Sequence, residues 1–162
     1  MSAIRNNSDI IKGGHLMVFV QDASSNYQPI GFATSHTLSK TLNTQQISTK
    51  DHGDSAAVLP QNLSWEITTE NLYSLNGYKA LNNAFKDMKE VTVYFGESTY
   101  AQNQAETGIV GVDGATDWAP TGFGESGKAY ITSLQVTAAA GDNATFSATF
   151  TGNGTLDAST AA

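Results

Sequence analysis

One short segment of this sequence combines residue types that metal binding or general base catalysis uses. Residues 51–54 read Asp-His-Gly-Asp, which places an imidazole between two carboxylates. The chain has three histidines, His15, His36 and His52, and no two of them stand at the i, i+4 or HxH spacing of metal ligands. We therefore interpret 51–54 as a solvated polar loop and predict no metal site there.

Acidic pairs are the next candidates for chemistry. Glu66 and Glu70 would suit glycoside hydrolysis, but on a strand they lie on one face about 13 Å apart, at ~3.3 Å per residue. That separation is too large for a catalytic pair. Residues 113–117 (Asp-Gly-Ala-Thr-Asp) lack the regular acidic positions and the closing Glu of a calcium loop.

Nucleophile and phosphate motifs are missing too. The glycines of 122–127 follow no predicted strand and open no predicted helix, as a phosphate-binding loop would. The chain has no cysteine and no Gly-x-Ser-x-Gly turn. The sequence therefore predicts no catalytic residue, no metal and no cofactor.

Composition narrows the class of partners. The net charge is −7, from 15 acidic and 8 basic residues, and Arg5 is the single arginine. A protein that binds a specific DNA sequence needs a cluster of lysine and arginine side chains, so the sequence excludes a DNA-binding regulator. Charged residues make up 14% of the chain, against about 25% in an average protein. A surface of small neutral polar groups is easily desolvated at an interface, and the alternative is an ordinary threonine-rich β-protein.

The length of 162 residues predicts one domain, 1–162, with flexible ends at 1–13 and 157–162. Without cysteine there is no disulfide. Residues 1–14 lack an apolar stretch typical of a signal peptide, and the longest apolar run, Leu16–Val20, is too short to span a bilayer.

The pattern of apolar residues predicts strands joined by turns, with one helix. Period-2 alternation or short apolar runs indicate strands at 16–21, 27–34, 37–42, 63–67, 91–95, 130–136 and 145–151. Gly152 and Gly154 should end the last strand. Tyr78, Leu81, Phe85 and Met88 lie at helical spacing, so we expect one helix whose stripe packs on a sheet. We expect Trp65, Phe85, Phe146 and Phe150 to be buried.

Two long polar segments, 44–57 and 98–127, have no such periodicity and are predicted to be loops. Each carries a few apolar residues that need a partner, among them Ile47 in the first and Ile109, Val112 and Trp118 in the second. Loops of this length are usually functional. We expect both to be mobile in a free subunit and ordered in an assembly.

Several segments occur in a familiar order along the chain. They are Pro-Ile-Gly-Phe-Ala-Thr-Ser (29–35), Ile-Ser-Thr-Lys-Asp (47–51), Ser-Trp-Glu-Ile (64–67), Gly-Lys-Ala-Tyr-Ile-Thr-Ser-Leu (127–134) and Ala-Thr-Phe-Ser-Ala-Thr-Phe-Thr-Gly-Asn-Gly (144–154). In this order and spacing, over about residues 13–157, the chain resembles the tail tube proteins of long-tailed bacteriophages.

The resemblance implies a mainly β fold with one flanking helix, in which two packed antiparallel sheets form a barrel-like sandwich. It implies hexameric rings of identical subunits that stack into a hollow tube for DNA delivery. The tube would be part of the virion tail, assembled in the bacterial cytoplasm, without membrane contact. Further partners would be tail tip, terminator and, where one is present, sheath proteins. The residues expected to mediate assembly are Ile47, Ser48, Thr49, Lys50, Asp51, Ile109, Val112 and Trp118.

Two other functions remain open from the sequence. A carbohydrate- or host-binding β-module would use Tyr100, Trp118 and Phe123 of 98–127 as stacking residues. A small β-barrel enzyme is the other alternative, although no catalytic set is visible. Electron microscopy of the purified protein separates these functions from a tube subunit.

Overall fold

The computed structural model describes residues 16–21, 27–30, 33–48, 50–53, 55–73, 75–98 and 120–159. Its elements are β1 (Leu16–Gln21), β2 (Tyr27–Pro29), β3 (Ala33–Ile47), the 3-10 helix η3 (Lys50–His52), β4 (Ala57–Leu72), α1 (Leu75–Lys86), β5 (Val91–Ser98), β6 (Pro120–Thr137) and β7 (Thr145–Ser159). In this part of the chain, no helix is long and apolar enough to cross a membrane.

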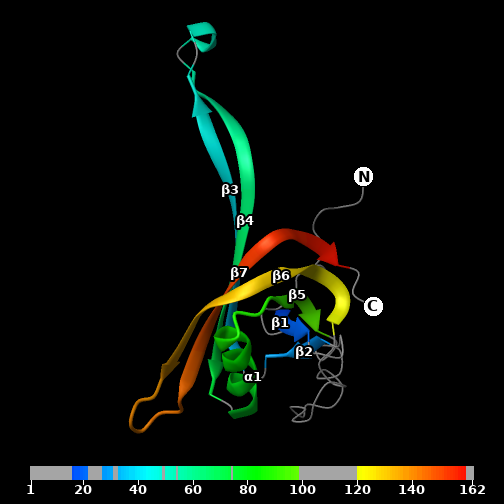
Figure 1. The fold of residues 1–162 in the computed structure, drawn as a ribbon, viewed down its shortest axis with the longest axis vertical. Helices are drawn as coiled ribbons and strands as arrows, with labels where there is room; N and C mark the ends of the chain where they lie inside the picture. The colour runs from blue at the N-terminus through cyan, green and yellow to red at the C-terminus, as the bar shows by residue number, and fades with distance from the viewer. Residues whose placement is uncertain are drawn as a thin grey trace, which may run out of the picture.

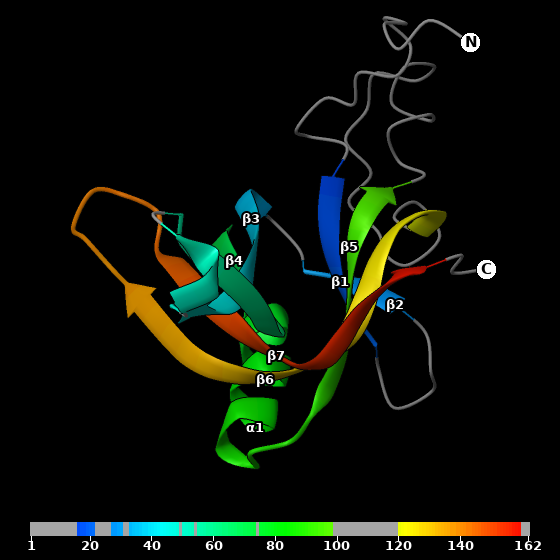
Figure 2. The ribbon, with the colours of Figure 1, turned by 90° about the horizontal axis from the view of Figure 1, so that it is seen from above.

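The described strands form one antiparallel sheet in the order β2-β1-β5-β6-β7-β4-β3. β2 and β3 lie at opposite edges, yet only residues 30–32 join them. Four Cα steps reach about 14 Å, whereas seven flat strands would hold the edges about 29 Å apart. The sheet must therefore curl until the edge strand β3 approaches β1, the neighbour of the opposite edge strand, as Figure 2 shows.

The predicted class, mainly β with one flanking helix, is confirmed. Where two packed sheets were expected, the two halves of one curled sheet pack against each other. The core joins Val18 of β1 and Val93 of β5 to Trp65 and Ile67 of β4. Register shifts in β6, between Gly127 and Lys128 and between Ile131 and Ser133, mark irregular pairing in the strand that crosses from one half to the other.

Trp65 is the largest side chain of this core, and its ring lies directly against the backbone of β7 at Gly152. A Cβ on Gly152 would lie 2.2 Å from the Trp65 ring, so only glycine fits there. The indole Nε1 donates a hydrogen bond to the Gly154 carbonyl at 3.1 Å. Burial of Trp65, Phe146 and Phe150 is confirmed, at 5%, 2% and 0% exposure.

The helix is present, but its buried stripe differs from the predicted one. Tyr78, Leu81 and Ala84 pack toward the core, while Phe85 is 39% exposed, so the prediction that Phe85 is buried was wrong. The core-facing residues Tyr78, Leu81 and Ala84 follow one another at intervals of three, so the buried stripe passes through Ala84 and leaves Phe85 beside it. Met88 lies beyond the helix end with φ of 50°, and 82% of it is exposed.

Three predicted boundaries are corrected. β3 continues to Ile47 and β4 starts at Ala57, so the predicted 44–57 loop is reduced to residues 48–56. β6 starts at Pro120, inside the predicted 98–127 loop. β7 passes Gly154 and reaches Ser159, because it pairs with β6 as far as Gly124, so the expected flexible end at 157–162 is a strand through Ser159. Residues 1–13 lie outside the described part.

Candidate assembly surfaces

The β3–β4 hairpin extends far beyond the rest of the sheet. β4 pairs with β7 only over Glu66–Leu72, whereas the β3–β4 ladder continues to the pair Ile47 and Ala57. Residues 41–64 are therefore a projecting two-stranded ribbon with η3 at its tip, visible at the top of Figure 1. We call residues 41–64 the arm.

The arm exposes apolar side chains that its own fold does not cover. Exposure is 53% for Leu42, 59% for Val58, 52% for Leu59 and 73% for Leu63. Side-chain amide pairs cross the ribbon, with Asn43 Nδ2 donating to Asn62 Oδ1 at 2.7 Å and Gln61 Nε2 to Gln45 Oε1 at 3.0 Å. A two-stranded hairpin alone is at most marginally stable in water. The arm thus has the construction of an element that a partner covers.

The first group of predicted assembly residues gathers at the end of the arm. Ile47 closes β3 and is half-buried, and Ser48, Lys50 and Asp51 follow it in exposed positions around η3. Thr49 lies outside the described residues. So do Ile109, Val112 and Trp118, and so does Tyr100 of the alternative carbohydrate site; Phe123 belongs to β6.

A second surface is a polar face across β3, β4, β7 and β6. Residues opposite one another in the ladders share a face of the sheet. They form the rows Ser39–Glu66–Thr151–Tyr130, Thr37–Thr68–Thr149–Ser133 and Ser35–Glu70–Ser147–Gln135. We call these twelve residues the polar face.

The polar face is rich in hydroxyl groups and carries charge of one sign. Glu66 and Glu70 are its two charged members and both are exposed. Thr132 and Thr151 share a hydrogen bond between their hydroxyls at 2.9 Å. Glu66 and Glu70, which sequence spacing rejected as a catalytic pair, are thus exposed acids among uncharged polar side chains. Sequence alternation placed both on one face, but not beside the hydroxyls of three other strands.

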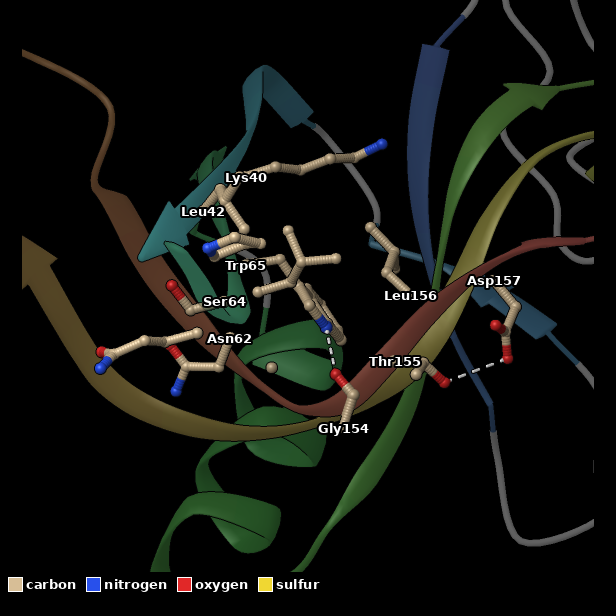
Figure 3. Close-up of a pocket in the computed structure, with 13 residues that line it drawn as sticks. Lys40, Leu42, Asn62, Ser64, Trp65, Gly154, Thr155, Leu156 and Asp157 are labelled. Carbon is tan, nitrogen blue, oxygen red and sulfur yellow. Dashed lines mark hydrogen bonds between the residues drawn. The ribbon is translucent and has the colours of Figure 1, made fainter. Parts of the chain in front are cut away.

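A third feature is a groove where β4 and β7 part. From Glu66 onward toward the arm, β4 leaves β7, and β7 from Gly152 pairs with β6 alone. The pocket between them has a volume of about 840 Å³. Trp65 lies deep in it, Leu42, Leu63 and Leu156 line it, and Lys40 and Asp157 are its charged residues (Figure 3). We call this pocket the fork groove.

Both charged residues of the fork groove have partners within the chain. The Lys40 ammonium forms an ion pair with the Glu125 carboxylate, across from β3 to β6. Thr155 Oγ1 donates to Asp157 Oδ2 at 3.3 Å. The sequence did not predict this groove, because its two walls are far apart along the chain. Trp65 and Gly154, which are joined by a hydrogen bond across it, are 89 positions apart.

His36 is a half-buried basic side chain on the opposite face of β3 from Ser35 and Thr37. It lies opposite Thr69 in the β3–β4 ladder, and burial lowers its pKa from 6.5 to about 4. Neither ring nitrogen has a hydrogen-bond partner within the described structure. Groups of three or more His, Cys, Asp or Glu that could hold a metal ion do not occur among the described residues.

Comparison with solved structures identifies proteins that share this fold. The structural relatives include the tail of an empty gene transfer agent (GTA) particle (TM-score 0.70, 14% identity, 91% of this chain and 98% of that one). They also include the virion of a native GTA particle (0.66, 15%, 91% and 97%) and the SPP1 tail tube (0.66, 14%, 91% and 78%). At these identities the likeness establishes the fold.

No curated protein sequence matches the chain significantly. A family model described as phage tail tube protein matches residues 10–158, nearly the whole chain. The chain therefore belongs to the phage tail tube protein family and is a structural subunit of the tail tube of a virion.

Proposed function

We propose that this subunit forms hexameric rings, which stack into a hollow tube through which DNA leaves the particle. The observation that carries the proposal is the polar face, bounded on both sides by strands with unpaired edges. The structurally similar tail of the empty GTA particle was determined with C6 symmetry, which supports six subunits per ring.

Ring closure uses the two open edges. Among the described strands, β3 is an edge strand along its length, and none pairs with β6 beyond Ala129 on its β5 side, which leaves residues 130–137 as an open edge. The four strands β6-β7-β4-β3 alternate in direction. Because four is an even number, head-to-tail repetition places β3 of one copy antiparallel to β6 of the next. Such heterologous pairing closes into a ring when the rotation fits.

The polar face would then line the lumen. Its hydroxyl groups bind water, and rings of carboxylates from Glu66 and Glu70 repel the phosphates of passing DNA. The twelve residues of the polar face include no lysine or arginine, so they offer the DNA phosphates no ion pair. The DNA therefore passes without specific binding.

The arms would connect successive rings. In a stack, each arm reaches the neighbouring ring, where its exposed leucines and Val58 become covered. Ile47, Ser48, Thr49, Lys50 and Asp51 at its end, and Ile109, Val112 and Trp118 of the segment before β6, are the residues we assign to these contacts. The tail tip, terminator and, where one is present, sheath proteins would meet the ends and the outside of this tube, assembled in the bacterial cytoplasm.

Electron microscopy and sedimentation velocity of the purified protein, over a wide concentration range, test the proposal. We expect rings with sixfold symmetry at low concentration and tubes at high concentration. A monomer at every concentration would contradict self-assembly.

The lumen assignment has its own test. Glu66→Lys with Glu70→Lys should leave tubes intact but make them bind duplex DNA in a salt-dependent way. Lys79→Glu, on the exposed side of α1, is the control that should leave DNA binding unchanged. Tubes of the double variant that bind no DNA would place another face in the lumen.

A further inference from the structure

The subunit has two projections at opposite ends of its long axis. The arm occupies one end and the β6–β7 turn, residues 138–144, occupies the other (Figure 1). We propose that the β6–β7 turn of one copy seats in the fork groove of the next copy along the tube. The inference rests on the proposed self-assembly and names the contact that sets the stacking of rings.

The fork groove is incomplete within one chain. Its walls are the β4 edge before Glu66 and the β7 edge after Thr151, and no described strand pairs with either edge on the side that faces the groove. Leu42 and Leu63 on its wall are 53% and 73% exposed. Unpaired strand edges and uncovered leucines both favour an inserted segment that offers backbone groups and small apolar side chains.

The turn has the shape and chemistry for such an insertion. Its residues Ala138, Ala139, Ala140 and Gly141 are small and exposed. The Asp142 amide donates to the Ala139 carbonyl at 3.3 Å, and Gly141 has φ of 90°, which makes a tight turn with glycine at its third position. No atom lies within 4 Å of where a Gly141 Cβ would be, and residues 138–143 are exposed, so the tip of the turn projects freely, while Ala144 at its base accepts a hydrogen bond from the Tyr73 amide at 2.8 Å.

The direction in which the groove opens favours this occupant. Asp142 is the one charged residue of the turn, and the described residues that line the groove include one basic side chain, Lys40, and one acidic side chain, Asp157. Asp142 would share Lys40 with Glu125. The groove opens toward the arm end of the molecule, because β4 and β7 separate in that direction (Figure 1). Copies that stack head to tail along this axis therefore present the turn of one to the groove of the other.

The pairing also predicts a spacing between rings. Gly141 and Gly154 are 13 positions apart along the chain. At ~3.3 Å per residue, β7 places the turn at most about 43 Å from the groove. Because β7 is curved, the axial repeat should be somewhat below that value.

Cysteine cross-linking tests the contact directly, since the chain has no native cysteine. Tubes of the double variant Ala140→Cys, Leu63→Cys should give a ladder of covalent oligomers on oxidation. A mixture of the two single variants should give dimers only, and each single variant alone should stay uncross-linked. Ala140→Cys with Lys79→Cys on α1 is the matched control and should give no ladder.

The outcomes separate this inference from the proposed function. Tubes without a ladder would overturn the turn-in-groove contact and leave self-assembly intact. Wild-type protein that forms no tubes would instead overturn the proposed function. A ladder from Ser48→Cys with Leu63→Cys, in place of the predicted pair, would put the arm tip in the groove and overturn the inference.

A steric variant gives an independent readout. Ala140→Arg should leave the subunit folded and able to form rings, because Ala140 is exposed at the tip of the turn, but the rings should no longer stack. We expect at least a tenfold rise in the concentration needed for tubes, with Asn83→Arg on α1 as the unaffected control. Tubes of normal length and abundance from Ala140→Arg would overturn the contact.

Discussion

β4 passes through two regions that differ sharply in burial. Between Trp65 and Asn71, alternate residues are buried in the core, whereas every residue from Val58 to Ser64 is exposed. The first region is stabilised by its own chain. The second has the same strand geometry, but its apolar side chains, such as Val58 and Leu63, are exposed in the subunit. The comparison teaches that regular structure in this protein extends beyond what the monomer can bury.

Core truncation should separate the two regions most strongly. Phe150 in the sheet body is 0% exposed, and Phe150→Ala should lower the free energy of unfolding of the isolated subunit by about 3–5 kcal/mol. Leu63→Ala in the arm should change it by less than ~0.5 kcal/mol, because Leu63 is 73% exposed. Urea denaturation of both variants measures this. Equal losses would mean that the arm is folded into the monomer core.

Acid should weaken the body through His36. Burial lowers its pKa in the folded state to about 4, while the unfolded chain binds a proton near pH 6.5. The contribution of neutral His36 is thus complete above pH 6.5 and is lost as pH falls to 4. At 1.36 kcal/mol per pKa unit, and reduced for partial exposure, the loss is roughly 2–3 kcal/mol.

The variant His36→Gln should flatten the stability curve between pH 6.5 and 4 in chemical denaturation of the free subunit. A variant with the full wild-type slope would show that other groups cause the acid sensitivity.

A methyl group on Gly152 tests the close contact behind the fork groove. The new Cβ would overlap the Trp65 ring, which must shift, and Gly152→Ala should destabilise the subunit by about 1–3 kcal/mol. Gly141→Ala is the contrasting change: it meets no neighbour, and its cost comes only from φ of 90°, about 1 kcal/mol. Thermal unfolding of the two variants provides the measurement, and a larger effect at Gly141 would contradict the packing described for Trp65.

The smallest expected effect is a gain at the end of α1. The Lys89 amide donates to the Ala84 carbonyl and the Met88 amide to the Phe85 carbonyl, the pattern of a helix end at which glycine is preferred. Met88 occupies the left-handed position, and its side chain makes little contact. Met88→Gly should therefore raise the free energy of unfolding by up to about 1 kcal/mol. Destabilisation would show that Met88 packs in the subunit.

Strands with strict alternation could be predicted from the sequence. The Leu63–Ile67 pattern located a strand and the buried Trp65, and Phe146 and Phe150 followed the same rule. The arm could not be predicted, since residues 44–47 and 57–62 show no alternation. Their strand conformation comes from cross-strand pairing, including the Asn43–Asn62 and Gln45–Gln61 amides. The fork groove and the polar face were equally hidden, because both depend on which strands become neighbours.

The local sequence pattern also did not predict which residues of the helix are buried. Phe85 fits the predicted stripe by spacing, but Ala84, a smaller residue, lies toward the core instead. Which of two adjacent apolar residues faces the sheet depends on the rotation of α1 over β6, and spacing alone does not determine that rotation.

Hydrogen exchange on free subunits and on assembled tubes tests the central claim most directly. Amides of the arm, residues 41–47 and 57–64, should exchange rapidly in the free subunit and become at least tenfold more protected in tubes. Amides of β4 between Glu66 and Asn71 should be protected in both states. Equal protection of the arm in the free and assembled protein would contradict the claim that the arm is completed by a second copy.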